Sequence, residues 1–100
     1  MAVVTVDDIR GAVSANAFRA GREYEADGLV SHLRLLSEGR VVEAKVQGSA
    51  PRPYRVRVML GLRVRDGATL VSGACSCPVG YNCKHVAAAL FAAVQRESSS

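Results

Sequence analysis

Residues 55–76 read RVRVMLGLRVRDGATLVSGACS, and this stretch has the clearest strand pattern in the chain. Successive side chains of a strand point to opposite faces, so two alternating sets predict one buried and one solvated face. The apolar set is Val56, Val58, Leu60, Leu62 and Val64, and the basic set is Arg55, Arg57, Arg63 and Arg65. Asp66-Gly67 is a strong hairpin signal. A second strand, from Ala68 to about Ser76, is therefore expected to fold back beside the first.

The same period of two extends toward the N-terminus as far as Gly28. One strand is predicted from Leu29 to Leu36, and the Ser37-Glu38-Gly39 turn leads into the next. In that next strand Val42, Ala44 and Val46 alternate with polar residues. Residues 28–76 are therefore predicted to form an antiparallel four-stranded meander.

Helices are predicted at both ends of this sheet. Residues 5–27 form a helical segment, either one broken helix or two short ones, with a left-handed cap at Gly28. Asn82 is expected to cap a C-terminal helix that runs to about Arg96. The predicted fold class is α+β, and residues 1–100 are expected to form a single domain.

The composition is that of a small globular protein. Of the 100 residues, 49% are hydrophobic and 22% are charged, which is enough apolar surface for one core. No stretch approaches the roughly 18 apolar residues of a membrane span, and no signal peptide precedes the first helix. A cytoplasmic protein without membrane contact is expected. The formal net charge of +4 permits contact with nucleic acid without demanding it.

The three cysteines lie within nine residues, and a histidine follows two positions later. An odd number of cysteines in a reducing compartment argues against a disulfide framework. Zinc takes four sulfur or nitrogen donors in a tetrahedron, commonly from two short pairs joined by a turn. Cys75 with Cys77 and Cys83 with His85 are two such pairs. They predict one structural Zn²⁺, although the donors also suit iron or another thiophilic metal.

Three other interpretations of these residues stay open. In the first the cysteines are small buried apolar residues, in the second two of them are a redox-active pair, and in the third one is a nucleophile whose base is the histidine. Ser76, Pro78 and Gly80 make a poor core environment, and the sequence suggests no orienting group or oxyanion site. We therefore expect a protein that is not an enzyme and has no small-molecule substrate.

The motif Cys75-Ser76-Cys77-Pro78 followed by Cys83-Lys84-His85-Val86 resembles the SWIM zinc finger. The segment from Phe18 to Tyr24 is also similar to N-terminal segments of bacterial SWIM proteins. The resemblance implies a ββα finger, here over residues 75–96, whose C-terminal helix is clamped by zinc. It further implies contacts with DNA or with proteins, often beside helicase-like ATPases. This chain has no Gly-rich Walker loop, so ATPase activity is not carried over.

Two functions of different classes follow. The first is binding of DNA or RNA through five basic side chains: Arg55, Arg57, Arg63, Arg65 and Lys84. The second is a protein-interaction adaptor for a helicase-like ATPase or another nucleic-acid enzyme. A cysteine-based redox or catalytic site is a minor alternative. His32 is interpreted as a solvated strand histidine and not as a ligand.

Overall fold

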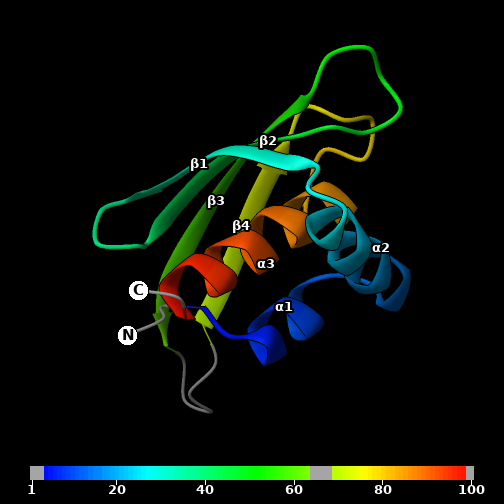
Figure 1. Ribbon diagram of the computed structural model, residues 1–100. Helices are drawn as coiled ribbons and strands as arrows, with labels where there is room; N and C mark the ends of the chain where they lie inside the picture. The colour runs from blue at the N-terminus through cyan, green and yellow to red at the C-terminus, as the bar shows by residue number, and fades with distance from the viewer. Residues whose placement is uncertain (1–3, 64–68, 99–100) are drawn as a thin grey trace.

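The computed structural model describes residues 4–63 and 69–98, which form three helices and one four-stranded antiparallel sheet (Figure 1). In chain order the elements are α1 (Val6–Ala12), α2 (Ala15–Ala26), β1 (Val30–Leu36), β2 (Val41–Val46), β3 (Tyr54–Arg63), β4 (Thr69–Cys75) and α3 (Lys84–Ser98). The strand order is β1-β2-β3-β4, so each strand pairs with its neighbour along the chain. The predicted α+β meander is confirmed.

The N-terminal segment forms two short helices because each has its own cap. Thr5 and Asp8 make a reciprocal capping box at the start of α1, and the Ser14 side chain caps α2. Helix α2 ends at Ala26, and Gly28 just beyond it has φ +73° and donates its N–H to the carbonyl of Glu25. The predicted left-handed cap is confirmed.

The sheet register separates a buried face from an open one, as the alternation predicts. Apolar pairs on β2 and β3 point toward the helices: Val42 with Val58, and Ala44 with Val56. Polar pairs between them lie on the other face: Glu43 with Arg57, and Lys45 with Arg55. Arg63 is the last residue of β3, beyond a register shift after Leu60. Arg65 and the predicted Asp66-Gly67 turn lie outside the described residues.

All three helices lie on one side of the sheet (Figure 1). Helix α3 contacts all four strands, and α2 packs along α3. The core lies between sheet and helices, where Ile9, Val58 and Leu90 are completely buried. Within residues 4–63 and 69–98, no helix is both long and apolar enough to cross a membrane.

Strand β1 departs from the regular strand that the sequence predicts. Ser31 pairs with Lys45 and Arg34 with Glu43, so two residues of β1 face one residue of β2. His32 occupies this β-bulge with φ +54°. The extra residue changes the parity, and Ser31 and Arg34 therefore both face away from the helices. A bulge of this kind has no signature in the alternation of apolar and polar residues.

Candidate metal centre

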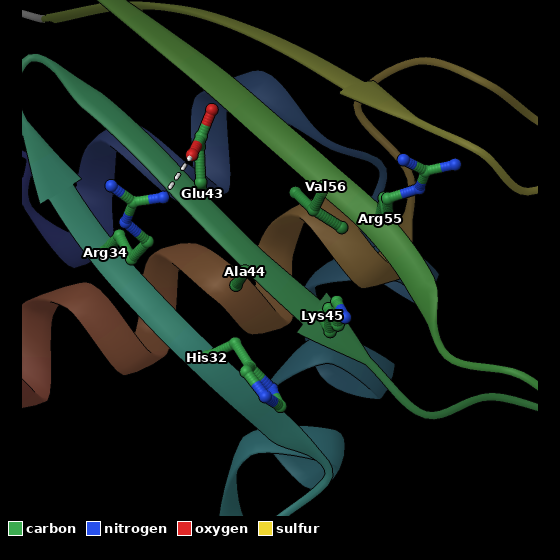
Figure 2. A pocket seen from close by; sticks show the side chains of 7 residues that line it. All are labelled: His32, Arg34, Glu43, Ala44, Lys45, Arg55 and Val56. Atoms are coloured by element: carbon green, nitrogen blue, oxygen red, sulfur yellow. Dashed lines mark ion pairs between the residues drawn. The ribbon is translucent and has the colours of Figure 1, made fainter.

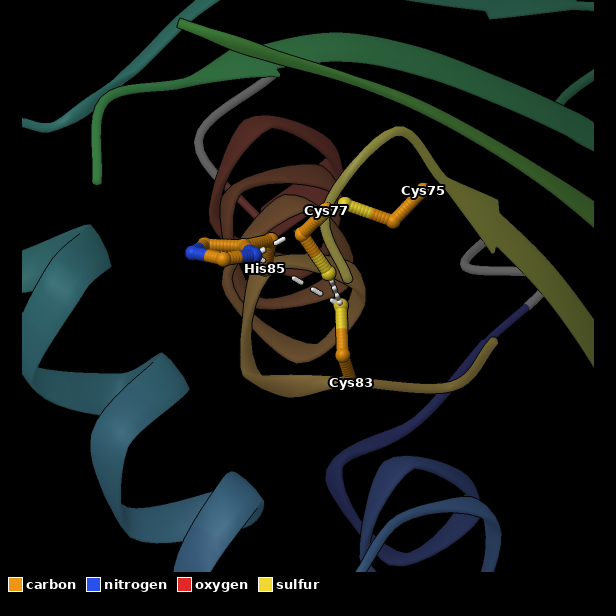
Figure 3. A group of neighbouring side chains, drawn as sticks. All are labelled: Cys75, Cys77, Cys83 and His85. Atoms are coloured by element: carbon orange, nitrogen blue, oxygen red, sulfur yellow. Dashed lines mark hydrogen bonds between the residues drawn. The ribbon is translucent and has the colours of Figure 1, made fainter. Parts of the chain in front are cut away.

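The four predicted donors come from the end of β4, the loop that follows it, and the first turn of α3 (Figure 3). Gly80, at φ +81°, turns the loop back along β4. Its carbonyl accepts from the N–H of Cys75 at 3.1 Å, and the Asn82 N–H donates to the Gly73 carbonyl at 2.9 Å. These bonds return the chain to β4, so Cys83 and His85 come back beside Cys75 and Cys77.

Asn82 fixes this loop and does not cap α3, so the predicted cap is wrong. Its Oδ1 accepts from the Gly73 N–H at 2.8 Å, and its Nδ2 donates to the carbonyl of Ala12 at 3.2 Å. Its own φ is +41°, and α3 begins two residues later, at Lys84. Asn82 therefore ties the loop to both β4 and α1. The sequence suggested a cap because asparagine is common before helices.

The donor atoms lie at the separations that one tetrahedral ion requires. The ligand atoms of the four residues, three Sγ atoms and one imidazole nitrogen, all lie within 4.8 Å of one another. His85 Nδ1 is 3.6 Å from the Sγ atoms of both Cys75 and Cys83, and the Sγ atoms of Cys77 and Cys83 are 3.5 Å apart. A tetrahedron with Zn–S bonds of about 2.3 Å has edges of about 3.8 Å. The residues therefore fit a zinc ion with a Cys₃His donor set.

Burial and hydrogen bonding shift the proton affinities of the cysteines in opposite directions. Burial raises the pKa of the Cys75 thiol to about 12. Burial also disfavours the thiolate of Cys77, but bonds from the Gly80 N–H and the neighbouring thiols outweigh it and lower the pKa. Two adjacent thiolates repel each other without a cation, whereas a coordinated ion deprotonates both. Three thiols and an imidazole that lie this close together suit a coordinated cation.

His85 is held as a neutral imidazole between two aromatic rings. Burial, and to a lesser extent the charge of Lys84, lowers its pKa, and a neutral ring is the form that binds metal. Its ring centroid is 4.5 Å from that of Tyr54 and 5.6 Å from that of Tyr24. Nε2 is buried with no hydrogen-bond partner among the described residues, and Nδ1 faces the cysteines. Nδ1 is therefore the ligand atom.

Sequence reasoning did not identify the residues that hold the imidazole. No role was predicted from the sequence for Tyr54 or Gly48. A Cβ on Gly48 would lie 2.8 Å from Tyr54 Cε2 and 3.0 Å from His85 Nε2, so a larger residue would push into the site. Both residues contact His85 across long stretches of sequence. No local signal could have identified them.

The basic residues that were predicted to contact nucleic acid do not all lie in one place. Arg55 and Arg57 stand two residues apart on the open face of β3. Lys84 lies instead at the start of α3, where its Nζ is 5.6 Å from the centroid of the Tyr24 ring on α2. Arg63 ends β3, and Arg65 is outside the described residues. Of the three whose side chains the structure describes, Arg55 and Arg57 lie together and Lys84 lies elsewhere.

Comparison with known proteins identifies the part of the chain that holds the metal centre. Residues 54–93 match the family model of the SWIM zinc finger. This segment begins at β3, includes all four donors and extends through most of α3. No curated protein and no solved structure matches the chain significantly.

Proposed function

Because residues 54–93 are a SWIM zinc finger, we propose that this chain is a non-catalytic module that binds nucleic acid through the open face of its sheet. Zn²⁺ would be held by Cys75, Cys77, Cys83 and His85 and would supply a cross-link between β4 and α3. Four protein donors fill a tetrahedral site and leave no position for an activated water. Recognition is therefore assigned to the surface around the finger. A cytoplasmic location stays a prediction.

The observation that carries this proposal is the positive charge on the open face. Arg55 and Arg57 project from β3, and Lys45 lies opposite Arg55 on β2. Lys45 and Arg55 have no ion-pair partner among the described residues. Arginine and lysine side chains in such positions bind phosphates and release counterions, which makes binding dependent on salt.

The zinc loop adds an aromatic ring on the same side of the sheet. Arg57 lies opposite Ala74 on β4, and Ala74 in turn forms an antiparallel bridge with Tyr81. Bridged residues share a face, so Tyr81 is about two strand spacings, roughly 10 Å, from Arg57. Its side chain is exposed. An exposed ring beside a basic surface can stack on a nucleic-acid base.

Arg55→Glu/Arg57→Glu tests the proposal. The matched control is Arg19→Glu/Arg22→Glu, which changes the net charge equally at exposed positions of α2. A fluorescent duplex and its single strands are titrated at several salt concentrations after zinc content and fold are checked. Two lost phosphate contacts should reduce the slope of log affinity against log salt by about 1.8 on duplex DNA. The proposal fails if the parent does not bind at low salt, or if both variants bind alike.

A second candidate function is the protein-interaction adaptor, and apolar residues on the same face favour it. Met59 on β3 and Leu70 on β4 are 57% and 62% exposed. Large exposed apolar side chains on neighbouring strands are typical of protein contacts. Two observations together would favour this function over the first: salt-insensitive binding to a helicase-like ATPase, and no binding to DNA or RNA. Cysteine-based chemistry remains a minor alternative.

A further inference from the structure

The open face of the sheet contains a hollow of about 390 Å³ whose rim crosses three strands. His32 and Arg34 of β1, Lys45 of β2 and Arg55 of β3 line it, and Glu43 lies at one edge (Figure 2). We call these five residues and the hollow between them the basin. Of the five, only Arg55 was predicted from the sequence to contact nucleic acid.

The fixed charges of the basin sum to a positive value. Arg34, Lys45 and Arg55 contribute three positive charges, and Glu43 contributes one negative charge. Glu43 is already shared, because Arg34 Nη1 is 3.8 Å from one carboxylate oxygen and Arg57 Nη1 is 3.7 Å from the other. Both guanidinium groups are largely exposed, and exposed ion pairs at such distances are weak. Arg34 can therefore turn toward an anion at little cost.

The β-bulge at His32 builds the rim of the basin. A non-glycine residue at φ +54° is uncommon, although histidine tolerates this region better than most residues. A bulge changes the direction in which side chains point. This one brings the His32 imidazole to the basin and keeps Arg34 on the open face. His32 Nδ1 lies 3.2 Å from the Ser31 Oγ, which orients the ring. Without the extra residue, Arg34 or the following leucines would change face.

The positive surface crosses the strands and does not continue along β3. The next residue of β3 on the open face beyond Arg57 is Met59, which is exposed and apolar. In the other direction, Lys45 and Arg34 extend the charge from Arg55 across β2 to β1. Strands are spaced by about 4.8 Å, so side chains from three strands can approach one anion from several directions.

We propose that the basin binds a phosphodiester group, so that a nucleic-acid backbone crosses β1, β2 and β3. This inference rests on the proposed nucleic-acid function and names the residues that contact the backbone. A phosphodiester spreads one negative charge over two non-bridging oxygens, and the guanidinium and ammonium groups that line the basin are the donors that pair with such a group. Contacts of this kind position the backbone and carry no sequence information. Binding through the basin is therefore independent of sequence.

The test compares Arg34→Gln/Lys45→Gln with the control Arg19→Gln/Arg22→Gln, which removes the same charge from α2. Loss of one phosphate contact should reduce the salt slope by about 0.9 on duplex DNA and about 0.7 on a single strand. The control should keep the slope of the parent. His32→Gly removes the imidazole and suits the positive φ, so it should weaken binding without lowering the melting temperature. Equal binding by the parent, the double variant and His32→Gly would overturn the inference and leave the proposed function intact.

A second measurement separates the basin from the wider function. Inorganic pyrophosphate is titrated into the zinc-loaded protein, and backbone amide shifts are followed by NMR. Saturable shifts are expected at residues 32, 34, 45 and 55, and the Arg34→Gln/Lys45→Gln variant should lose them. If these shifts occur but no oligonucleotide binds, the basin is supported as a phosphate site and the proposed function fails. If no residue of the basin shifts, the inference is wrong.

Discussion

A single glycine sets the distance between the two main helices. Gly21 of α2 is buried against α3, and an added Cβ would lie 2.5 Å from Ala87 Cβ and 2.9 Å from the Lys84 carbonyl oxygen. Neither a backbone oxygen nor the Cβ of an alanine can rotate away. The close approach therefore depends on glycine at this position.

Gly21→Ala should destabilise the protein by about 1–3 kcal/mol through overpacking. The control is Gly11→Ala in α1, where an added Cβ meets nothing within 4 Å. There the higher helix propensity of alanine should raise stability by as much as about 1 kcal/mol. Urea unfolding of both zinc-loaded variants measures the difference. Equal stability of the two would show that α2 and α3 are not in close contact at Gly21.

At the residue scale, the sequence predicts the metal donors but not their supports. Four donors with short spacings are visible locally, and the structure brings Cys75, Cys77, Cys83 and His85 together. The positive φ of His32 and the bonds of Asn82 to β4 and α1 depend on partners distant in sequence. Patterns within a short window contain no information on such partners.

At the scale of elements, the metal joins the buried helix α3 to a loop that has less support from the core. From Val86 to Leu90, α3 is completely buried between the sheet and α2. The loop before α3 has less support, since it is fixed by the Asn82 bonds, by the bridge between Ala74 and Tyr81, and by the donors themselves. Loss of the metal should therefore affect the loop and the first turn of α3 more than β1–β3.

Cys77→Ser should lower amide protection mainly in residues 76–88. Each loss of about 1.4 kcal/mol in local stability reduces protection from exchange about tenfold. Apparent binding free energies of structural zinc are about 10–16 kcal/mol, so the loss of protection should be large enough to measure. Hydrogen exchange measures the effect, with Ser72→Ala at an exposed position of β4 as the control. Unchanged protection in residues 76–88 would mean that the metal does not hold the loop.

The elements themselves were largely predictable, and the reasons for the exceptions are physical. Strand β2, and β3 as far as Leu60, bury every second residue, so their alternation predicts both faces. Strand β1 contains a bulge, which breaks that relation between sequence and face. Leu90 and Phe91 do not fit one narrow helical stripe, which allowed burial of α3 on two sides, and the structure buries both residues between the sheet and α2.

At the scale of the whole molecule, the proposed binding surface lies on the face of the sheet that the helices leave open (Figure 1). The helices lie on one side of the sheet (Figure 1), and Lys45, Arg55 and Arg57 lie on the other. Tyr81 links the metal centre to this open face, because the loop that holds the donors also aligns this ring with Ala74 and Arg57. If the chain binds nucleic acid as proposed, removal of zinc is expected to weaken that binding.

The central claim is that the Cys₃His cluster binds one zinc ion per chain. Native mass spectrometry together with elemental analysis of protein purified without added metal tests it most directly. One zinc per chain is expected in the parent, and its loss is expected in Cys83→Ser. A metal-free parent that is monodisperse and fully folded would contradict it. So would a disulfide between Cys77 and Cys83, whose Sγ atoms are 3.5 Å apart, that persists under reducing conditions.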